Sequence, residues 1–183
     1  VHYNKKILVS KSHDNDWYML SYKNSIGYIN NKYVSKTRQE YAEYNVPYAK
    51  NKTWMPYTAI TSKSSKQYKL QQIAYTGKYG IRMVDNRYCV ALGSYFGCEI
   101  GQYFDLVLAN NIVIPCIMSD QKDNRHTDSV NIITVDTNCL SEFIIDRQAL
   151  NYEAKRDGDI SSCRDEWKSH VEKIRVYKKV VKL

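Results

Sequence analysis

The chain has 183 residues, 43% of them hydrophobic and 25% charged, which excludes general disorder and suffices for one folded domain with a small appendage. Its formal net charge of +8 favours an anionic partner, such as nucleic acid, a membrane surface or an anionic cell-wall polymer. The lysines are spread along the whole chain, which disfavours nucleic acid because its binders usually carry a compact basic face. No stretch approaches the roughly 18 apolar residues of a membrane-spanning helix, so we expect no membrane span.

Residues 1–36 predict a small β module. Trp17 to Tyr22 form one strand-like run, a polar turn follows at Lys23 to Ser25, and Ile26 to Ile29 form a second run. Two short runs joined by a tight polar turn are typical of a β-hairpin. The next segment, 37–53, is polar and shows no sustained period, so we predict a linker there.

Residues 54–183 predict a second, mainly β domain with one short helix. Val, Ile, Tyr and Thr are concentrated in short runs that are separated by Asn, Asp and Gly, a pattern that favours strands. The expected strands are Tyr57–Thr61, Ile73–Thr76, Tyr88–Leu92, Phe104–Leu108, Ile112–Met118, Val130–Val135, Glu142–Ile145 and Ile174–Val181, and the expected helix is Ser162–His170. Many short strands at close spacing indicate a closed barrel or a sandwich.

The cysteines and histidines argue against a metal or a redox cofactor. The five cysteines stand far apart with no C-x-x-C pair, so we expect buried free thiols and neither disulfides nor zinc ligation. The four histidines are scattered, which disfavours metal-dependent hydrolysis, and no glycine-rich phosphate loop is present. We therefore expect no metal and no cofactor.

Two sequence patterns resemble known families. The run DNDWYMLSY followed by IGYINNKYVSK resembles the second half of a bacterial Src-homology-3-like domain, and this resemblance implies a partial module over 1–36 that binds cell-wall peptides or serves as a spacer. The runs VALGSYFG, IGQYFDLVLANNIVIPCIMSDQKDNRHTD and GDISSCRDEWKSHVEKIRVYK resemble the double-psi β-barrel of A-type membrane-bound lytic transglycosylases and of "three-aspartate" cell-wall domains. The second resemblance covers roughly Tyr88 to Tyr177 and implies a double-psi barrel with appended strands.

The second resemblance also implies a catalytic acid. It assigns Asp120 to the second family aspartate and Asp128 to the third, with Gly93 standing where the family carries its first acid. Cleavage of a glycosidic bond needs a carboxyl group that protonates the leaving oxygen, and burial or a neighbouring carboxylate raises the pKa of such an acid. On this hypothesis Asp128 is the acid, and Asp120 orients it or raises its pKa.

Three further residues are candidates for contacts with the sugar: His126, Lys122 and Tyr95. The alternative for this polar loop is that its acids and amides serve turn geometry and solvation, which is our interpretation of Asp123, while Asp105 is interpreted as a charge on a strand face.

The predicted function is cleavage of peptidoglycan glycan strands by a lytic transglycosylase-like domain of a Gram-positive bacterium or its phage. Its partners would be peptidoglycan or another anionic wall polymer and, in a phage, other tail proteins. Its place would be the cell wall, the extracellular space or a virion tail. The alternative is a non-catalytic structural or wall-binding module of a phage tail or baseplate, favoured by Gly93 in place of an acid. A third hypothesis, DNA binding by the basic surface, predicts a steep dependence of affinity on salt.

Overall fold

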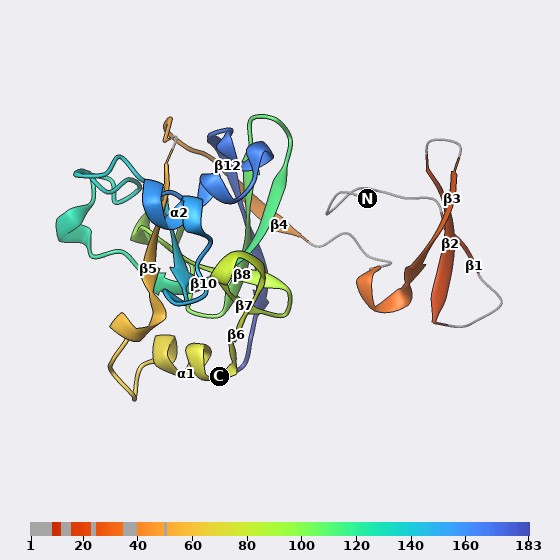
Figure 1. Cartoon of the computed structure of the whole chain (residues 1–183), viewed down its shortest axis with the longest axis horizontal. Coiled ribbons are helices and arrows are strands. Elements are labelled where there is room, and N and C mark those ends of the chain that lie inside the picture. The colour runs from red at the N-terminus through yellow and green to blue at the C-terminus, as the bar shows by residue number, and fades with distance from the viewer. Residues whose placement is uncertain (1–8, 12–15, 23–24, 35–39, 50) are drawn as a thin grey trace. The chain divides into compact units, whose positions relative to one another are not determined.

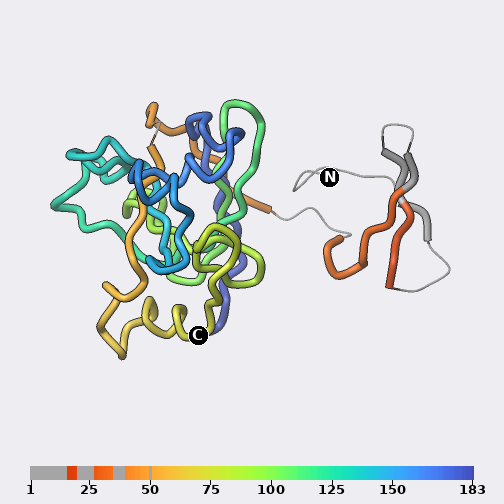
Figure 2. The backbone as a smooth tube through the Cα atoms, viewed as in Figure 1, coloured from red at the N-terminus to blue at the C-terminus, as the bar shows by residue number. Residues whose placement is uncertain are grey.

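The structure is a computed structural model that describes residues 9–11, 16–22, 25–34, 40–49 and 51–183. The chain divides into two compact units, Val1–Glu40 and Tyr41–Leu183, whose courses can be followed in Figures 1 and 2. We describe each unit by itself. No described helix is long and apolar enough to cross a membrane.

The first unit contains a three-stranded antiparallel sheet. Its strands are β1 (Val9–Lys11), β2 (Trp17–Tyr22) and β3 (Ser25–Asn30), in the order β1-β2-β3. The register of β2 and β3 pairs Trp17 with Asn30 and Tyr22 with Ser25, which confirms the predicted hairpin. A short 3-10 turn follows at Asn31–Tyr33, and the Asn30 side chain accepts a hydrogen bond from the Lys32 amide at 3.1 Å.

The second unit is built on a nine-stranded mixed sheet. Along the chain its strands and helices are β4 (Tyr41–Asn45), β5 (Lys52–Pro56), α1 (Lys66–Ile73), β6 (Tyr75–Thr76), β7 (Arg82–Val84), β8 (Arg87–Leu92), β9 (Gln102–Leu108), β10 (Val113–Gln121), β11 (Ser141–Ile145), α2 (Tyr152–Asp157) and β12 (Val171–Val180). The strand order is β4-β12-β9-β10-β8-β11-β5, with β7 on β8 and β6 on β7. Two pairings are parallel, β10 with β8 and β11 with β5.

The prediction of a mainly β fold is confirmed, while the predicted closed barrel is not found. The path of strand pairing begins at β4 and ends at β5, and no pairing joins these two strands in the described part of the chain. Five predicted strands coincide over most of their length with observed ones: Tyr88–Leu92 with β8, Phe104–Leu108 with β9, Ile112–Met118 with β10, Glu142–Ile145 with β11 and Ile174–Val181 with β12.

The segment 37–53, where we predicted a linker, contributes to this sheet from Tyr41 onward. β4 pairs antiparallel with β12, so that Tyr41 stands opposite Tyr177, and β5 already begins at Lys52. The predicted strand Tyr57–Thr61 is wrong, because the strand ends at Pro56 and a 3-10 turn occupies Tyr57–Ala59.

The predicted strand at Val130–Val135 is wrong because a side chain satisfies its backbone. The Asp128 carboxylate accepts the amides of Ile132 at 2.7 Å and Ile133 at 3.3 Å, which replaces the hydrogen bonds of a strand ladder. This segment forms turns with isolated bridges at Thr134 instead.

Local geometry overturns two further predictions of secondary structure. The predicted helix Ser162–His170 is two 3-10 turns, Ile160–Cys163 and Asp165–Lys168, because Arg164 between them is extended at φ −154° and ψ 133°. Of the predicted strand Ile73–Thr76, only Tyr75–Thr76 is extended, since Ile73 ends the unpredicted helix α1.

The sheet has an apolar core on each face. Along β8, Val90 and Leu92 point into the larger core, while Cys89 and Ala91 point into a smaller one. The smaller core comprises Leu70, Val84, Cys89, Ala91, Tyr103, Ile117, Ile144 and Tyr177. Because Leu70 belongs to α1 and is fully buried, this helix lies against the smaller core.

A buried lysine ties the segment 157–170 to the edge of the sheet. Lys52 of β5 is fully buried, and its ammonium donates to Ser161 Oγ at 3.2 Å and to the Trp167 and Ser169 carbonyls at 2.8 and 2.9 Å. Burial lowers the pKa of Lys52 to about 8. These acceptors explain why a charged side chain can be fully buried at this edge of the sheet.

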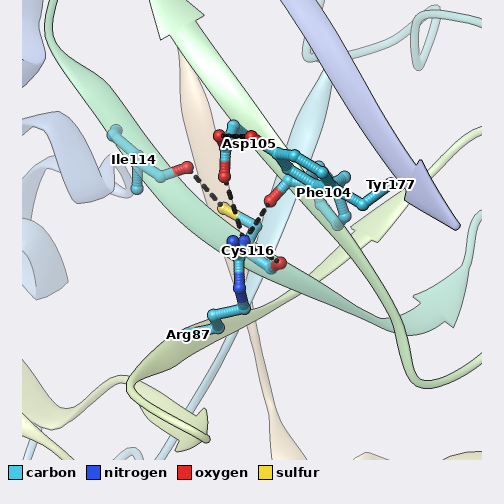
Figure 3. Close-up of polar contacts among 6 residues, drawn as sticks. All are labelled: Arg87, Phe104, Asp105, Ile114, Cys116 and Tyr177. Carbon is cyan, nitrogen blue, oxygen red and sulfur yellow. Dashed lines mark hydrogen bonds and ion pairs between the residues drawn. The ribbon is translucent and has the colours of Figure 1, made fainter. Parts of the chain in front are cut away.

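A second buried charge joins the central strands. Arg87 of β8 and Asp105 of β9 form an ion pair of 3.0 Å with 3% and 0% of their surface exposed (Figure 3). The Arg87 guanidinium also donates to the carbonyls of Phe104 at 2.8 Å and Cys116 at 3.0 Å, and the Tyr177 hydroxyl donates to Asp105 at 2.5 Å. Burial raises the pKa of Asp105, and the nearby Arg87 charge opposes this rise. Asp105 therefore lies on a strand face, as interpreted from the sequence, but this face is buried and the charge is an interior one.

We predict that Asp105→Ala lowers the free energy of unfolding by about 3 to 5 kcal/mol, because it removes the carboxylate that compensates the buried Arg87 charge. The measurement is urea unfolding followed by circular dichroism. Asp165→Ala is the matched control, since its ion pair with Lys168 is exposed and should contribute little to stability. Equal losses for the two variants would contradict the structural role of the buried pair.

Candidate functional site

Two carboxylates lie in one row across three strands of the sheet. Asp120 of β10 and Glu142 of β11 are both paired with Ala91 of β8, one from each side. Residues paired in register point to the same face, so both carboxylates lie on the α1 side of the sheet with Ala91. With neighbouring strands about 4.8 Å apart, their Cα atoms are roughly 10 Å apart, and their side chains can approach over the small alanine.

A bulge in β10 sets the direction of Asp120. The register with β8 shifts between Met118 and Asp120, so that Ser119 is the extra residue. Met118 belongs to the larger core, and without the bulge the alternation of a strand would turn Asp120 toward that same core. The inserted residue moves Asp120 to the other face, beside α1.

Helix α1 contributes a neutral donor to Asp120. The Gln67 side chain donates to Asp120 Oδ1 at 3.4 Å, and the Gln121 amide donates to the same oxygen at 2.9 Å. Asp120 is half-buried, and burial raises its pKa, while these two hydrogen bonds oppose the rise. A carboxyl group with a raised pKa at a surface is suited to proton transfer.

Glu142, which we did not select from the sequence, is the second member of the row. It is half-buried, and burial raises its pKa, the Lys122 charge lowers it and the Asp120 charge raises it. An acidic residue within the otherwise apolar run SEFII was the available signal. It could not be used from sequence because the pairing that brings Glu142 to Asp120 is non-local.

Lys122 is buried, so it is not a surface residue of a groove. Its ammonium donates to Thr134 Oγ1 at 2.8 Å and to the Cys139 carbonyl at 2.6 Å, and burial lowers its pKa. These bonds tie the segment 122–139 together, and the ammonium acts on Glu142 electrostatically. Lys122 is therefore a supporting group of the row.

Asp128 lies in the loop after β10, away from the paired row. Its carboxylate accepts the Ile132 and Ile133 amides, and its own amide donates to the Ile133 carbonyl at 2.8 Å. Among the described residues, no hydrogen bond joins Asp128 to Asp120. The structure thus gives Asp128 a clear role in loop conformation.

The other two predicted contact residues lie in exposed turns. His126 is exposed in the 3-10 turn Asn124–His126. Tyr95 is 50% exposed and packs edge-on against Tyr44 and Phe96, with ring centroids 6.1 and 5.3 Å apart. The structure does not place either residue in the row of Asp120 and Glu142.

The absence of a side chain at position 93 has a steric explanation. A Cβ atom built at Gly93 would lie 1.9 Å from the carbonyl oxygen of Asn131, because the loop after β10 crosses directly over this residue. An acidic side chain therefore cannot be accommodated at position 93 while the loop follows this path. Glu142, from a different strand, supplies the second carboxylate of the site.

We predict that Gly93→Ala lowers the free energy of unfolding by about 1 to 3 kcal/mol, since the loop backbone must move to admit the methyl group. Chemical denaturation measures this change. Gly97→Asn is the control: Gly97 has φ +59°, which asparagine tolerates, and nothing lies within 4 Å of the position that a Cβ atom would take there. A neutral Gly93→Ala variant would contradict the described loop path.

The cysteines are free thiols, as predicted. Cys89, Cys98, Cys116 and Cys139 are buried and Cys163 is partly buried, with no disulfide in the described part of the chain. Burial raises the pKa of Cys89 to about 11, so a nucleophilic thiolate is disfavoured there. The described residues include no cluster of three or more His, Cys, Asp or Glu side chains that could hold a metal ion.

Each of two cavities is lined by a residue that contacts or pairs with the row or its neighbour. One, of about 620 Å³, adjoins the edge strand β5 and is lined in part by Thr53, which is paired with Glu142. The other, of about 410 Å³, adjoins α1 and is lined in part by Gln71. The Gln71 side chain donates to Ser119, the neighbour of Asp120, at 2.7 Å.

Comparison with known proteins adds no relative to this description. No protein-family model, no curated protein and no solved structure matches the chain.

Proposed function

We propose that the second unit cleaves the glycan strands of peptidoglycan, with Asp120 as the catalytic acid. One observation carries the proposal: a half-buried carboxyl group whose pKa is raised by burial is aligned across the sheet with a second carboxylate. The sequence resemblance over Tyr88–Tyr177 supports the reaction but not this assignment of the acid, since it implies Asp128 as the acid and Asp120 as its partner. The parallel pairings of β8 with β10 and of β5 with β11 agree with kinship to a double-psi barrel, which we propose as the origin of the fold.

Asp120 would serve as acid and then as base. Its proton passes to the glycosidic oxygen as the bond from that oxygen to the anomeric carbon breaks. The resulting Asp120 carboxylate then takes the proton of the sugar's own hydroxyl group, whose oxygen bonds to the anomeric carbon and closes an anhydro ring. Every proton is returned, and no water is consumed.

Glu142 would carry the negative charge of the pair. The Lys122 ammonium favours the ionised form of Glu142, whereas Asp120 receives hydrogen bonds from neutral groups only. On this proposal the shared proton lies on Asp120, although the Asp120 charge also raises the pKa of Glu142 and the two groups titrate as a coupled pair. The Glu142 carboxylate would stabilise positive charge that develops at the anomeric carbon.

A second candidate is a non-catalytic wall-binding or structural module of a phage tail. Two observations favour it: the loop over Gly93 excludes the first family acid, and Asp128 is engaged by loop amides. For either function we propose peptidoglycan as the partner and the cell wall or a virion tail as the place of action. The antiparallel sheet of residues 9–30 is proposed as the partial Src-homology-3-like module.

We predict that Asp120→Asn lowers the rate of wall cleavage by about 10²- to 10⁴-fold, the range contributed by a positioned acid. The assay incubates the full chain with purified Gram-positive cell walls and detects anhydro-muropeptides by mass spectrometry. Asp128→Asn keeps an oxygen that accepts the loop amides, so it should retain activity within a few-fold. Asp123→Asn, in an exposed turn, is the control.

The outcomes separate the candidates. No anhydro product from the wild-type chain supports the non-catalytic module, provided that the chain still binds the walls. If Asp120→Asn is active and Asp128→Asn is inactive, Asp120 is not the acid and Asp128 is.

We predict that Glu142→Gln shifts the alkaline limb of the pH–rate profile toward lower pH. The rate requires protonated Asp120 and falls as pH rises through its pKa. Because coupling between two titrating groups is mutual, loss of the Glu142 charge lowers the pKa of Asp120. The profile of kcat/KM between pH 4 and about 8 tests this shift, and an unmoved or alkaline-shifted limb would contradict the coupling.

A further inference from the structure

The cavity beside α1 is walled by aromatic and neutral polar side chains. Its lining includes Tyr57, Tyr68, Gln71 and Gln72, together with two threonines and Lys63. No carboxylate lines it, and its one cationic residue is Lys63, although the chain as a whole carries a net charge of +8. This composition does not suit a metal ion or a polyphosphate, which need clustered carboxylates or clustered cations.

One aromatic wall is held in place. The Arg82 guanidinium lies over the Tyr57 ring at 4.7 Å. Arg82 is itself fixed, because it donates to the carbonyl oxygens of Gln71 at 2.9 Å and Ala74 at 2.6 Å. A ring that is already ordered loses little conformational entropy when a ligand packs against it.

The polar wall is continuous with the candidate acid. Gln71 is 4% exposed and bonds to Ser119, while Gln67, one turn earlier on α1, bonds to Asp120. One helix therefore contributes both to the cavity wall and to the position of the acid. Gln71 thus links the cavity wall to Ser119, the residue that precedes Asp120 in β10, while Asp120 itself is not part of the lining.

We propose that this cavity is a glycan subsite, which holds the sugar ring that adjoins the bond cleaved by Asp120. A pyranose presents C–H groups to an aromatic ring and hydroxyl or acetamido groups to amides and hydroxyls, and this wall offers both. Lys63, which also lines the cavity, could pair with the lactyl carboxylate of a muramic acid residue that carries no stem peptide. The claim that the bound sugar adjoins the cleaved bond rests on the function proposed above. Saccharide binding in the cavity does not require catalysis.

The test measures binding of a tetrasaccharide of alternating N-acetylglucosamine and N-acetylmuramic acid to the full chain. Calorimetric titration of the Asp120→Asn chain avoids turnover. The combined substitution Tyr68→Ala with Gln72→Ala should raise Kd at least tenfold, because it removes one ring and one amide from the wall. Tyr152→Ala, which removes an exposed tyrosine of α2 outside this cavity, should leave Kd unchanged.

A second variant keeps the test valid if the double substitution unfolds the chain. Lys63→Glu changes one exposed side chain, and it should weaken the muramic-acid-containing tetrasaccharide several-fold while leaving the uncharged tetramer of N-acetylglucosamine unaffected. Unchanged affinities in both variants, or no binding of either saccharide to the Asp120→Asn chain, would overturn the subsite.

This result is distinct from a failure of the proposed function. A wild-type chain that releases no product, yet binds the tetrasaccharide through Tyr68 and Gln72, has the subsite without the cleavage. If the chain is active, and substitution of Tyr68 and Gln72 changes neither KM nor Kd, the chain cleaves glycan without using this subsite.

Discussion

The buried ion pair between Arg87 and Asp105 is the constraint on which the second unit depends. It lies where four strands meet: the guanidinium from β8 reaches a carboxylate and a carbonyl of β9 and a carbonyl of β10, and Tyr177 of β12 closes the other side. Such a group tolerates no slip, because a shift by one residue would leave charges and carbonyls unpaired inside the sheet. The alignment of β8 with β10 then determines which residue stands opposite Ala91.

The candidate site follows from that alignment and from one irregularity. With the central strands fixed, the extra residue Ser119 turns Asp120 out of the larger core and toward α1. Helix α1 contributes Gln67 and Gln71, whose side chains donate hydrogen bonds to Asp120 and Ser119 respectively. A bulge that disrupts a ladder is thus compensated by side chains from the covering helix, and the acid is positioned from both sides.

The central strands could be predicted from sequence because their apolar runs are long and bounded by polar turns, as at Tyr88–Leu92 and Phe104–Leu108. The prediction fails where a side chain replaces a ladder, as Asp128 does at Ile132 and Ile133. The prediction from sequence also found one residue of the proposed catalytic pair, Asp120, because it lies at the end of an apolar run. Glu142 was missed, because only its non-local pairing with β8 brings it close to Asp120. The burial of Asp105 was missed for the same reason, since its partner Arg87 lies on another strand.

The crossing of the loop over Gly93 limits how this site could change in evolution. A backbone carbonyl occupies the space that a side chain at position 93 would need, so an acid there and the present loop path exclude one another. A single-codon substitution at Gly93 would therefore damage the fold before it could add chemistry. An acid at position 93 would require an insertion or deletion within 124–135, so that loop length and acid count would change together.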